Sequence, residues 1–302
     1  MGSASRSGNR DDEALKSPDP LRAHVEMLAG AIGQRNVWQF GALRRACAYI
    51  KDQFVSFGYE PAVQTYDVHN VPVDNIEAVL PGTDDPGAII VVGAHYDSVT
   101  DCPGANDNAT GVAATLELAR RFARAPRPKT IRFVAFVNEE PPFFQTPQMG
   151  SVVYANAAKG RGEHILAMLS LETIGYYSDA PGSQQYPRPL SLMFPDTGNF
   201  IAFVSNFGSA RLLRTAHRAF KARTSFPIQS APAPESLAGV GWSDQWAFWR
   251  AGYPAIMVTD TAPYRYPWYH RPQDTPDKIA FDKLTQVVGG LEHVVHVLAG
   301  GV

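Results

Sequence analysis

The chain has 302 residues, with 27 Lys and Arg against 29 Asp and Glu, so its formal net charge is −2 at pH 7. A charge so close to zero argues against a nucleic-acid-binding protein or a polybasic membrane-surface protein, because both depend on an excess of Lys and Arg. Hydrophobic residues make up 45% of the chain and charged residues 19%, which is enough apolar material for a large buried core. The composition indicates a globular protein, and we expect neither nucleic acid nor a membrane among its partners.

The N-terminal segment is polar and has no periodic pattern. We therefore predict a disordered leader over residues 1–17 and one domain over residues 18–302. The segment has no apolar stretch that could form the core of a signal peptide, and no run of about 18 apolar residues occurs anywhere in the chain. As written, the sequence predicts a soluble, cytoplasmic protein, although cleavage of an export signal would leave the same sequence.

Helix-like and strand-like patterns alternate along the rest of the chain. Apolar residues at helical spacing predict helices over 43–54, 112–122, 151–158, 200–207, 211–221, 243–250 and 284–298. Short apolar runs predict strands over 76–80, 88–94, 130–137, 165–171 and 254–259, and a proline-interrupted loop spans 226–234. This alternation indicates an α/β fold with a largely parallel, helix-covered sheet.

Acidic and histidine side chains follow these strands. In chain order they are His95 and Asp97, then Glu139 and Glu140, then Glu172, and finally His270, while Asp107 lies in a loop bounded by Gly104 and Gly111. The carboxyl ends of the strands in an open α/β sheet form the usual binding edge. Several carboxylates converging there would repel one another without a cation to neutralise them.

The types of donor atom indicate which cation the site would bind. Two histidines and several carboxylates, without a cysteine cluster, suit a divalent metal and favour zinc. His95 and Asp97 are two residues apart, so in a strand both point to the same side, where Asp97 could accept the ring hydrogen of His95. Glu139 and Glu140 are adjacent, so one could bind metal while the other acts as a base towards water.

Five motifs in this order resemble peptidase family M28, the zinc aminopeptidases. They are HYDS, GANDNATG, NEEPP, SLETIGYY and YHRPQDTPDK, and together they span about Val92 to Lys278. The resemblance implies a single-domain α/β/α sandwich, with a mixed, mostly parallel central sheet flanked by helices. It also implies two zinc ions per chain.

The resemblance also implies a role for each residue. Asp107 would bridge the two zinc ions, and the peptide bond after it would be cis. His95 and Glu172 would complete one metal site, and Glu140 and His270 the other. Glu139 would be the general base, and Asp97 the hydrogen-bond partner of His95. A tyrosine near the last histidine would assist the intermediate, and three tyrosines compete for that role: Tyr264, Tyr266 and Tyr269.

The chain departs from the family pattern at three positions. Glu172 stands where aspartate is frequent, Gln245 where histidine is expected, and Arg271 where a small polar residue is usual. We expect Gln245 to affect selectivity or loop packing, and Arg271 to offer a positive charge near the pocket. The loops over 177–189 and 226–234 are the expected walls of that pocket.

The predicted function is removal of the N-terminal residue from a peptide or small amide. Two other reactions remain open on the same scaffold: that of a glutaminyl cyclase, whose family uses one zinc ion, and that of a carboxypeptidase. A non-catalytic binding domain ranks last, because no expected ligand is missing. The sequence leaves the oligomeric state open, and it leaves the compartment open because family members are often exported.

Overall fold

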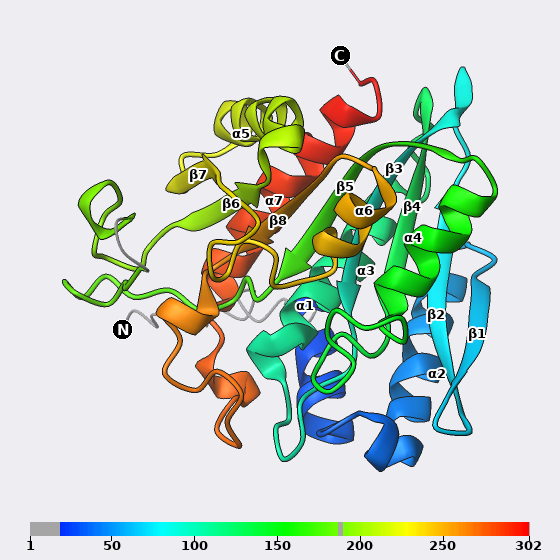
Figure 1. Ribbon diagram of the computed structural model, residues 1–302, viewed down its shortest axis with the longest axis horizontal. Helices are drawn as coiled ribbons and strands as arrows, with labels where there is room; N and C mark the ends of the chain where they lie inside the picture. Colours follow the sequence, from blue (N-terminus) through cyan, green and yellow to red (C-terminus); the bar gives the residue numbers. More distant parts are fainter. Residues whose placement is uncertain (1–18, 187–189, 302) are drawn as a thin grey trace, which may run out of the picture.

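The computed structural model describes residues 19–186 and 190–301. Its centre is an eight-stranded sheet with the strand order β1-β2-β4-β3-β5-β8-β6-β7 (Figure 1). The strands are β1 (Ala62–Val68), β2 (Val71–Leu80), β3 (Asp85–His95), β4 (Lys129–Phe136), β5 (His164–Glu172), β6 (Ile201–Ser205), β7 (Ile228–Pro232) and β8 (Ala255–Thr259). β3 pairs in parallel with β4 and β5, and β5 with β8, whereas β1, β2 and β6 add antiparallel pairs. The sheet is therefore mixed, with a parallel centre.

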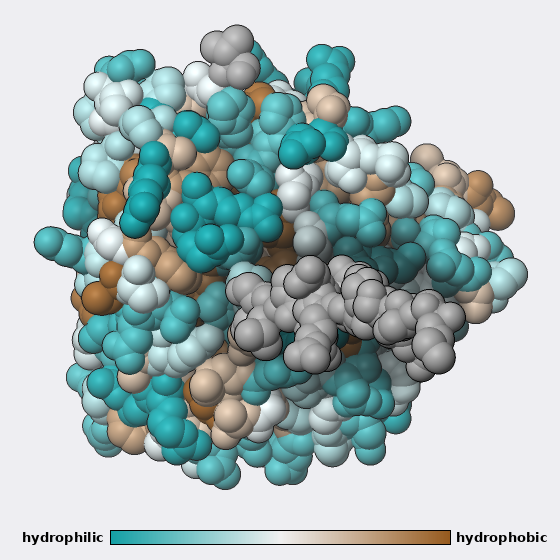
Figure 2. Space-filling model, turned by 180° about the vertical axis from the view of Figure 1, so that it is seen from behind, coloured by the Kyte–Doolittle hydropathy of each residue, from teal (hydrophilic) through white to brown (hydrophobic). Residues whose placement is uncertain are grey.

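Helices cover both faces of the sheet. They are α1 (Pro20–Val25), α2 (Phe40–Ser56), α3 (Thr110–Phe122), α4 (Gly150–Gly160), α5 (Ala210–Arg223), α6 (Gln245–Ala251) and α7 (Phe281–Leu298). α4 and α6 pack on one face, in front in Figure 1, and the other helices contribute to the core on the opposite face. Seen from that second side, the surface is mostly hydrophilic, with hydrophobic residues scattered over it (Figure 2). This arrangement is the expected α/β/α sandwich.

Strand β3 shows how the sequence specifies these layers. Ile90 and Val92 pack into the core under α3 and α7, whereas Ile89 and Val91 pack into the smaller core under α4 and α6. A strand with a helical layer on each face needs apolar side chains in both directions, so it is a continuous apolar run rather than an alternating one. Over the described ranges, none of the helices has the length and apolar character needed to cross a membrane.

Most of the predicted elements are present, but the helix expected over 200–207 is wrong. That segment contains strand β6, which pairs with β7 and β8. Phe200, Phe203 and Phe207 have helical spacing, which suggested one face of a helix. Phe200 and Phe203 are buried and Phe207 is 65% exposed, so the three rings do not share a buried face.

Two other segments differ from expectation. The predicted loop over 226–234 contains the edge strand β7, which tolerates its final Pro232 because an edge strand can lack a ladder donor. At the other edge, β1 had not been predicted; its side chains are mostly exposed or half-buried, so it carries little apolar signal. The predicted leader lies outside the described residues, and the division into leader and domain stays a prediction.

Gly111 lies where α3 approaches β5, next to the turn that carries Asp107. A Cβ atom at this position would lie 2.3 Å from the carbonyl oxygen of Leu171 and 2.4 Å from Oδ1 of Asn108. Both atoms belong to the supports of the strand end, because Asn108 donates to that same carbonyl oxygen at 2.8 Å. The absence of a side chain at Gly111 therefore lets the helix, the turn and the strand pack together.

We predict that Gly111→Ala lowers the free energy of unfolding by about 1–3 kcal/mol, as other overpacked sites do. Gly289→Ala is the matched control, because Gly289 lies in helix α7 with no atom within 4 Å of an added Cβ. There the alanine should stabilise by roughly 0.5–1 kcal/mol through helix propensity. Urea denaturation measures both, and equal effects of the two substitutions would contradict the packing account.

Candidate metal centre

The side chains expected at the site gather at one edge of the sheet, where the parallel strands end. His95 is the last residue of β3, and Glu172 is the last residue of β5. Glu139 and Glu140 follow β4, and His270 lies in the loop after β8. Asp107 reaches the same edge from the turn η3 (Ala105–Ala109). Adjacent parallel strands point their carboxyl ends to the same side, so residues far apart in sequence meet there. The expected cis peptide between Asp107 and Asn108 is present.

Asp107 lies between two groups of donor atoms. Its Oδ1 is 3.2 Å from Nε2 of His95, which is in turn 3.3 Å from Oε2 of Glu172. Its Oδ2 is 3.1 Å from Nε2 of His270, which is 3.3 Å from Oε2 of Glu140. Two donors on a tetrahedral zinc ion, with bonds of about 2.0–2.1 Å, lie about 3.3 Å apart. In each group the histidine nitrogen therefore lies at this spacing from two carboxylate oxygens, and ligand atoms of His95, Asp107 and Glu140 all lie within 4.8 Å of one another.

These polar atoms are buried and lack hydrogen bonds. His95 is 0% and Asp107 3% exposed. Within the described part of the chain, Nε2 of His95, Nε2 of His270, Oδ1 of Asp107 and Oε1 of Glu140 have no hydrogen-bond partner. A buried polar atom without a partner costs about 1–3 kcal/mol. These nitrogen and oxygen atoms converge on one place, as the ligands of divalent cations do.

The pKa values of the clustered side chains also indicate that a cation would stabilise the site. Burial lowers the pKa of His270, but the neighbouring carboxylates of Asp107 and Glu140 outweigh it and raise this pKa to about 10. Burial, followed by the negative charge of Asp107, raises the pKa of Glu140 to about 7. Burial also raises the pKa of Glu139 well above its ordinary value. The raised pKa values of Glu139 and Glu140 indicate that their negative charges are unfavourable here, and a cation would offset that cost.

Asp97 contacts both sides of the cluster. Its Oδ1 lies 3.5 Å from Nδ1 of His95 and accepts a hydrogen bond from the backbone N–H of Glu139 at 3.1 Å. Its Oδ2 accepts from the N–H of Glu140 at 3.1 Å. The predicted hydrogen bond from the His95 ring to Asp97 is not formed, because Nδ1 of His95 has no hydrogen-bond partner among the described residues. The contacts that Asp97 does make hold the Glu139–Glu140 backbone.

Two further residues that the sequence had not singled out support the site. Asp274 is fully buried and accepts from the backbone N–H groups of Asn106 and Asp107 at 2.8 and 3.1 Å. Ser243 donates to Oε2 of Glu172 at 2.7 Å. In the sequence, Asp274 appears only within the YHRPQDTPDK motif and Ser243 only as the residue two before Gln245, so their contacts could not be inferred from spacing.

The three candidate tyrosines have different surroundings. Tyr266 donates to Oδ1 of Asp274 at 2.7 Å, and Tyr264 donates to the carbonyl oxygen of Ala238 at 3.2 Å. The ring of Tyr269 stacks on His270 with 3.9 Å between centroids. Burial and the negative charges of Asp107 and Glu140 raise the pKa of Tyr269 well above its ordinary value. Among the described residues, Tyr264 and Tyr266 donate to a backbone carbonyl oxygen and to a carboxylate, whereas the hydroxyl group of Tyr269 makes neither contact.

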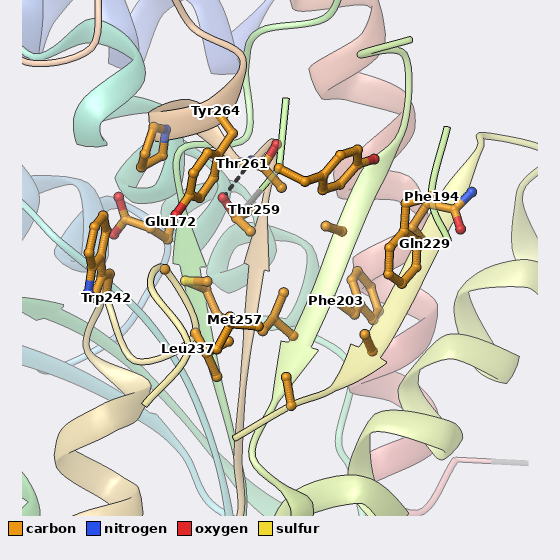
Figure 3. A pocket seen from close by; sticks show the side chains of 18 of the residues that line it. Glu172, Phe194, Phe203, Gln229, Leu237, Trp242, Met257, Thr259, Thr261 and Tyr264 are labelled. Carbon is orange, nitrogen blue, oxygen red and sulfur yellow. Dashed lines mark hydrogen bonds between the residues drawn. The ribbon is translucent and has the colours of Figure 1, made fainter. Parts of the chain in front are cut away.

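A pocket with a volume of about 110 Å³ opens beside the cluster (Figure 3). Glu172, Trp242 and Tyr264 lie near one end, and Phe203 and Phe194 lie on its other side. Most of the lining is apolar or neutral, and among its described residues Glu172 is the only charged one. A small number of polar groups in an apolar concavity is typical of a small-molecule site.

Both predicted wall segments contribute to this pocket. Gln184 and Tyr186 come from the first, and Gln229 and Ala231 from the second, while residues 187–189 lie outside the described residues. Gln245 is fully buried and donates to the carbonyl oxygen of Val240, which lines the pocket. Its role is therefore in loop packing. Arg271 is exposed and does not line the pocket.

Comparison with known proteins agrees with this geometry. Residues 75–295 match the model of peptidase family M28. The chain is 38% identical to the uncharacterized protein YfbL of Escherichia coli K12, over 91% of this chain and 86% of that protein. BSAP, a zinc aminopeptidase from Bacillus subtilis, has a similar fold, with a TM-score of 0.73 at 16% identity, covering 92% of this chain and 94% of BSAP.

A glutaminyl cyclase from Fimbriiglobus ruber also has this fold, with a TM-score of 0.70 at 21% identity, covering 93% of this chain and 96% of that chain. At these identities the two solved structures establish the fold, whereas the match to the family model covers most of the chain. The resemblance stated from the five motifs is confirmed, and with it the enzyme class, a metallopeptidase. The chain belongs to peptidase family M28.

Proposed function

We propose that this enzyme is a zinc-dependent aminopeptidase, which hydrolyses the bond after the N-terminal residue of a peptide. The observation that carries the proposal is the pair of donor groups sharing Asp107, placed beside Glu139 at the mouth of an apolar pocket. Membership of peptidase family M28 supports peptide hydrolysis. The Bacillus subtilis zinc aminopeptidase of the same fold supports the choice of metal and reaction.

Two zinc ions are proposed because the two donor groups are both complete. His95, Asp107 and Glu172 would hold one ion, and Asp107, Glu140 and His270 the other. When bound, such a pair would supply Lewis acidity to the scissile carbonyl group and lower the pKa of a bound water. With three protein donors on each side, room remains for water and substrate.

Glu139 is the proposed general base. Its Oε2 lies 3.8 Å from Nε2 of His95, so its carboxylate borders the donor groups without being part of the closest contacts. The Asp97 contact to its backbone fixes its position. We propose that Glu139 accepts a proton from the attacking water and then delivers it to the leaving amine. Tyr269 is the proposed hydrogen-bond donor to the carbonyl oxygen as charge develops there.

The pocket favours a substrate with a free amino end. Among the described lining residues no Lys, Arg or His is present that could bind a terminal carboxylate. The lining therefore lacks the cation that a carboxypeptidase needs for its substrate, which favours an aminopeptidase. The apolar walls favour an apolar side chain on the residue that is removed, because burying an unpaired charge there is costly.

We predict that Glu139→Gln lowers kcat by roughly 10²- to 10⁴-fold, the usual contribution of general acid–base catalysis. Zinc content should stay unchanged, because the proposed ligands remain. Glu292→Gln is the matched control, since Glu292 pairs with Arg121 on the surface, away from the site. Steady-state kinetics measure kcat, and metal analysis measures the zinc content of each variant. A kcat of Glu139→Gln near the wild-type value would exclude Glu139 as the base.

A panel of aminoacyl substrates tests the pocket. Leucyl and phenylalanyl substrates should have kcat/KM values at least about tenfold above aspartyl and lysyl ones, because an unpaired buried charge costs more than 1.4 kcal/mol. Peptides with N-terminal glutamine belong in the same panel. Their cyclisation without hydrolysis of the leucyl substrate would identify a glutaminyl cyclase instead, and the Glu139→Gln protein serves as the blank.

Removal of zinc tests the metal proposal. A ligand at 1,000 times its Kd stabilises the folded state by about 4 kcal/mol. For a chain of this size each kcal/mol moves the melting temperature by about 2–4 °C, so chelation should lower the melting temperature by roughly 10 °C. Two equivalents of zinc should restore it. One equivalent would favour the cyclase-like site, and an unchanged melting temperature with no bound zinc would reject the proposal.

A further inference from the structure

Arg35 is a fully buried arginine beside the proposed metal centre. Its guanidinium group donates to five backbone carbonyl oxygens, those of Leu28, Gly33, Tyr96, Pro103 and Gly104. Among the described residues no carboxylate forms an ion pair with it. A buried cation without a paired anion is unusual, because the loss of hydration is compensated only by the dipoles of the groups that it contacts.

Three of these carbonyl groups belong to the loop that joins His95 to Asp107. Nε donates to Tyr96 at 2.6 Å, directly after His95. Nη2 donates to Gly104 at 2.8 Å, and Nη1 donates to the preceding carbonyl group of Pro103. One planar group therefore holds both ends of residues 96–104, and the fork of the guanidinium fixes the distance between them.

The backbone of Arg35 holds the same loop. Its N–H donates to Oγ of Ser98 at 3.1 Å, and its carbonyl oxygen accepts from the N–H of Ser98 at 2.9 Å. Oγ of Ser98 in turn donates to the carbonyl oxygen of Cys102 at 2.9 Å. The loop is thus fastened near its start and near its end from one residue of the N-terminal segment.

The packing around Gly104 leaves little freedom at the end nearest Asp107. Gly104 has φ +65°, and a Cβ atom there would lie 2.4 Å from the carbonyl oxygen of Asp107 and 3.2 Å from Nη2 of Arg35. From the opposite side, Asp274 accepts the N–H groups of Asn106 and Asp107. A cation on the carbonyl side and an anion on the amide side therefore hold the turn that carries the shared carboxylate.

We propose that Arg35 is a positioning residue that sets the zinc affinity of the centre, by holding His95 and Asp107 at the separation that the donor groups require. This inference rests on the proposed metal site, and it adds a determinant of affinity that touches neither metal nor substrate. Groups that orient metal ligands without binding the metal typically change affinity by 10- to 100-fold when they are removed.

The test is the zinc Kd of folded, metal-stripped protein, measured by competition with a chromophoric chelator. Arg35→Lys keeps the positive charge and loses the fork, so its zinc Kd should rise about 10- to 100-fold. Val288→Ala is the control for general destabilisation, since Val288 is fully buried in α7, away from the loop. Its denaturation midpoint should fall while its zinc Kd stays within threefold of the wild-type value.

Ser98→Ala provides a milder variant in case Arg35→Lys does not fold, because it removes only the hydroxyl that Arg35 and Cys102 contact. Its zinc Kd should rise at least threefold. Folded Arg35→Lys protein, or failing that Ser98→Ala protein, with the wild-type zinc Kd would overturn the inference. Wild-type protein that binds no zinc would instead overturn the proposed function, so the two failures are distinguishable.

Discussion

The constraint on which the site depends is the mutual repulsion of buried carboxylates. Asp107, Glu139, Glu140 and Glu172 are each less than a tenth exposed, yet they lie together at the carboxyl ends of three neighbouring strands, β4, β3 and β5. Two histidines balance part of this charge, and raised pKa values for Glu139 and Glu140 balance more. Divalent cations would satisfy the unpaired donor atoms and the excess charge at once. The buried carboxylates that the fold brings together therefore favour the binding of cations.

The rest of the fold keeps these groups in place. Parallel pairing of β3 with β4 and β5, and of β5 with β8, brings four strand ends to one edge. Neutral and charged supports then fix each ligand: Asp97 holds the Glu139–Glu140 backbone, Ser243 holds Glu172, and Asp274 holds the turn of Asp107. Because the strands are rigid and the supports are buried, they hold the donor atoms close together at this edge of the sheet.

Much of this arrangement could be predicted from the sequence, for a physical reason. Buried parallel strands such as 88–94 and 165–171 are continuous apolar runs, and the polar residue that ends each run identifies the binding edge. The predictions failed where the local signal was ambiguous. Phe200, Phe203 and Phe207 have helical spacing, although only Phe203 lies in the short strand β6, and the exposed edge strand β1 has almost no apolar pattern.

The supports of the site could not be predicted in the same way. Arg35 lies 60 residues before His95 in a segment without a motif, and its role depends on carbonyl groups, which any residue type provides. Asp274 and Ser243 likewise act through contacts that only the folded chain creates. Only a few residue types can bind a metal ion, so candidate ligands can be recognised in a sequence. Many residue types can support a ligand if they lie in the right place, so supporting residues are recognised only in the structure.

The most direct test of the central claim is the anomalous scattering of a zinc-loaded crystal at the zinc absorption edge. The account predicts two peaks on either side of the Asp107 carboxylate, one beside His95 and Glu172 and the other beside Glu140 and His270. A single peak, or peaks away from Asp107, would contradict it.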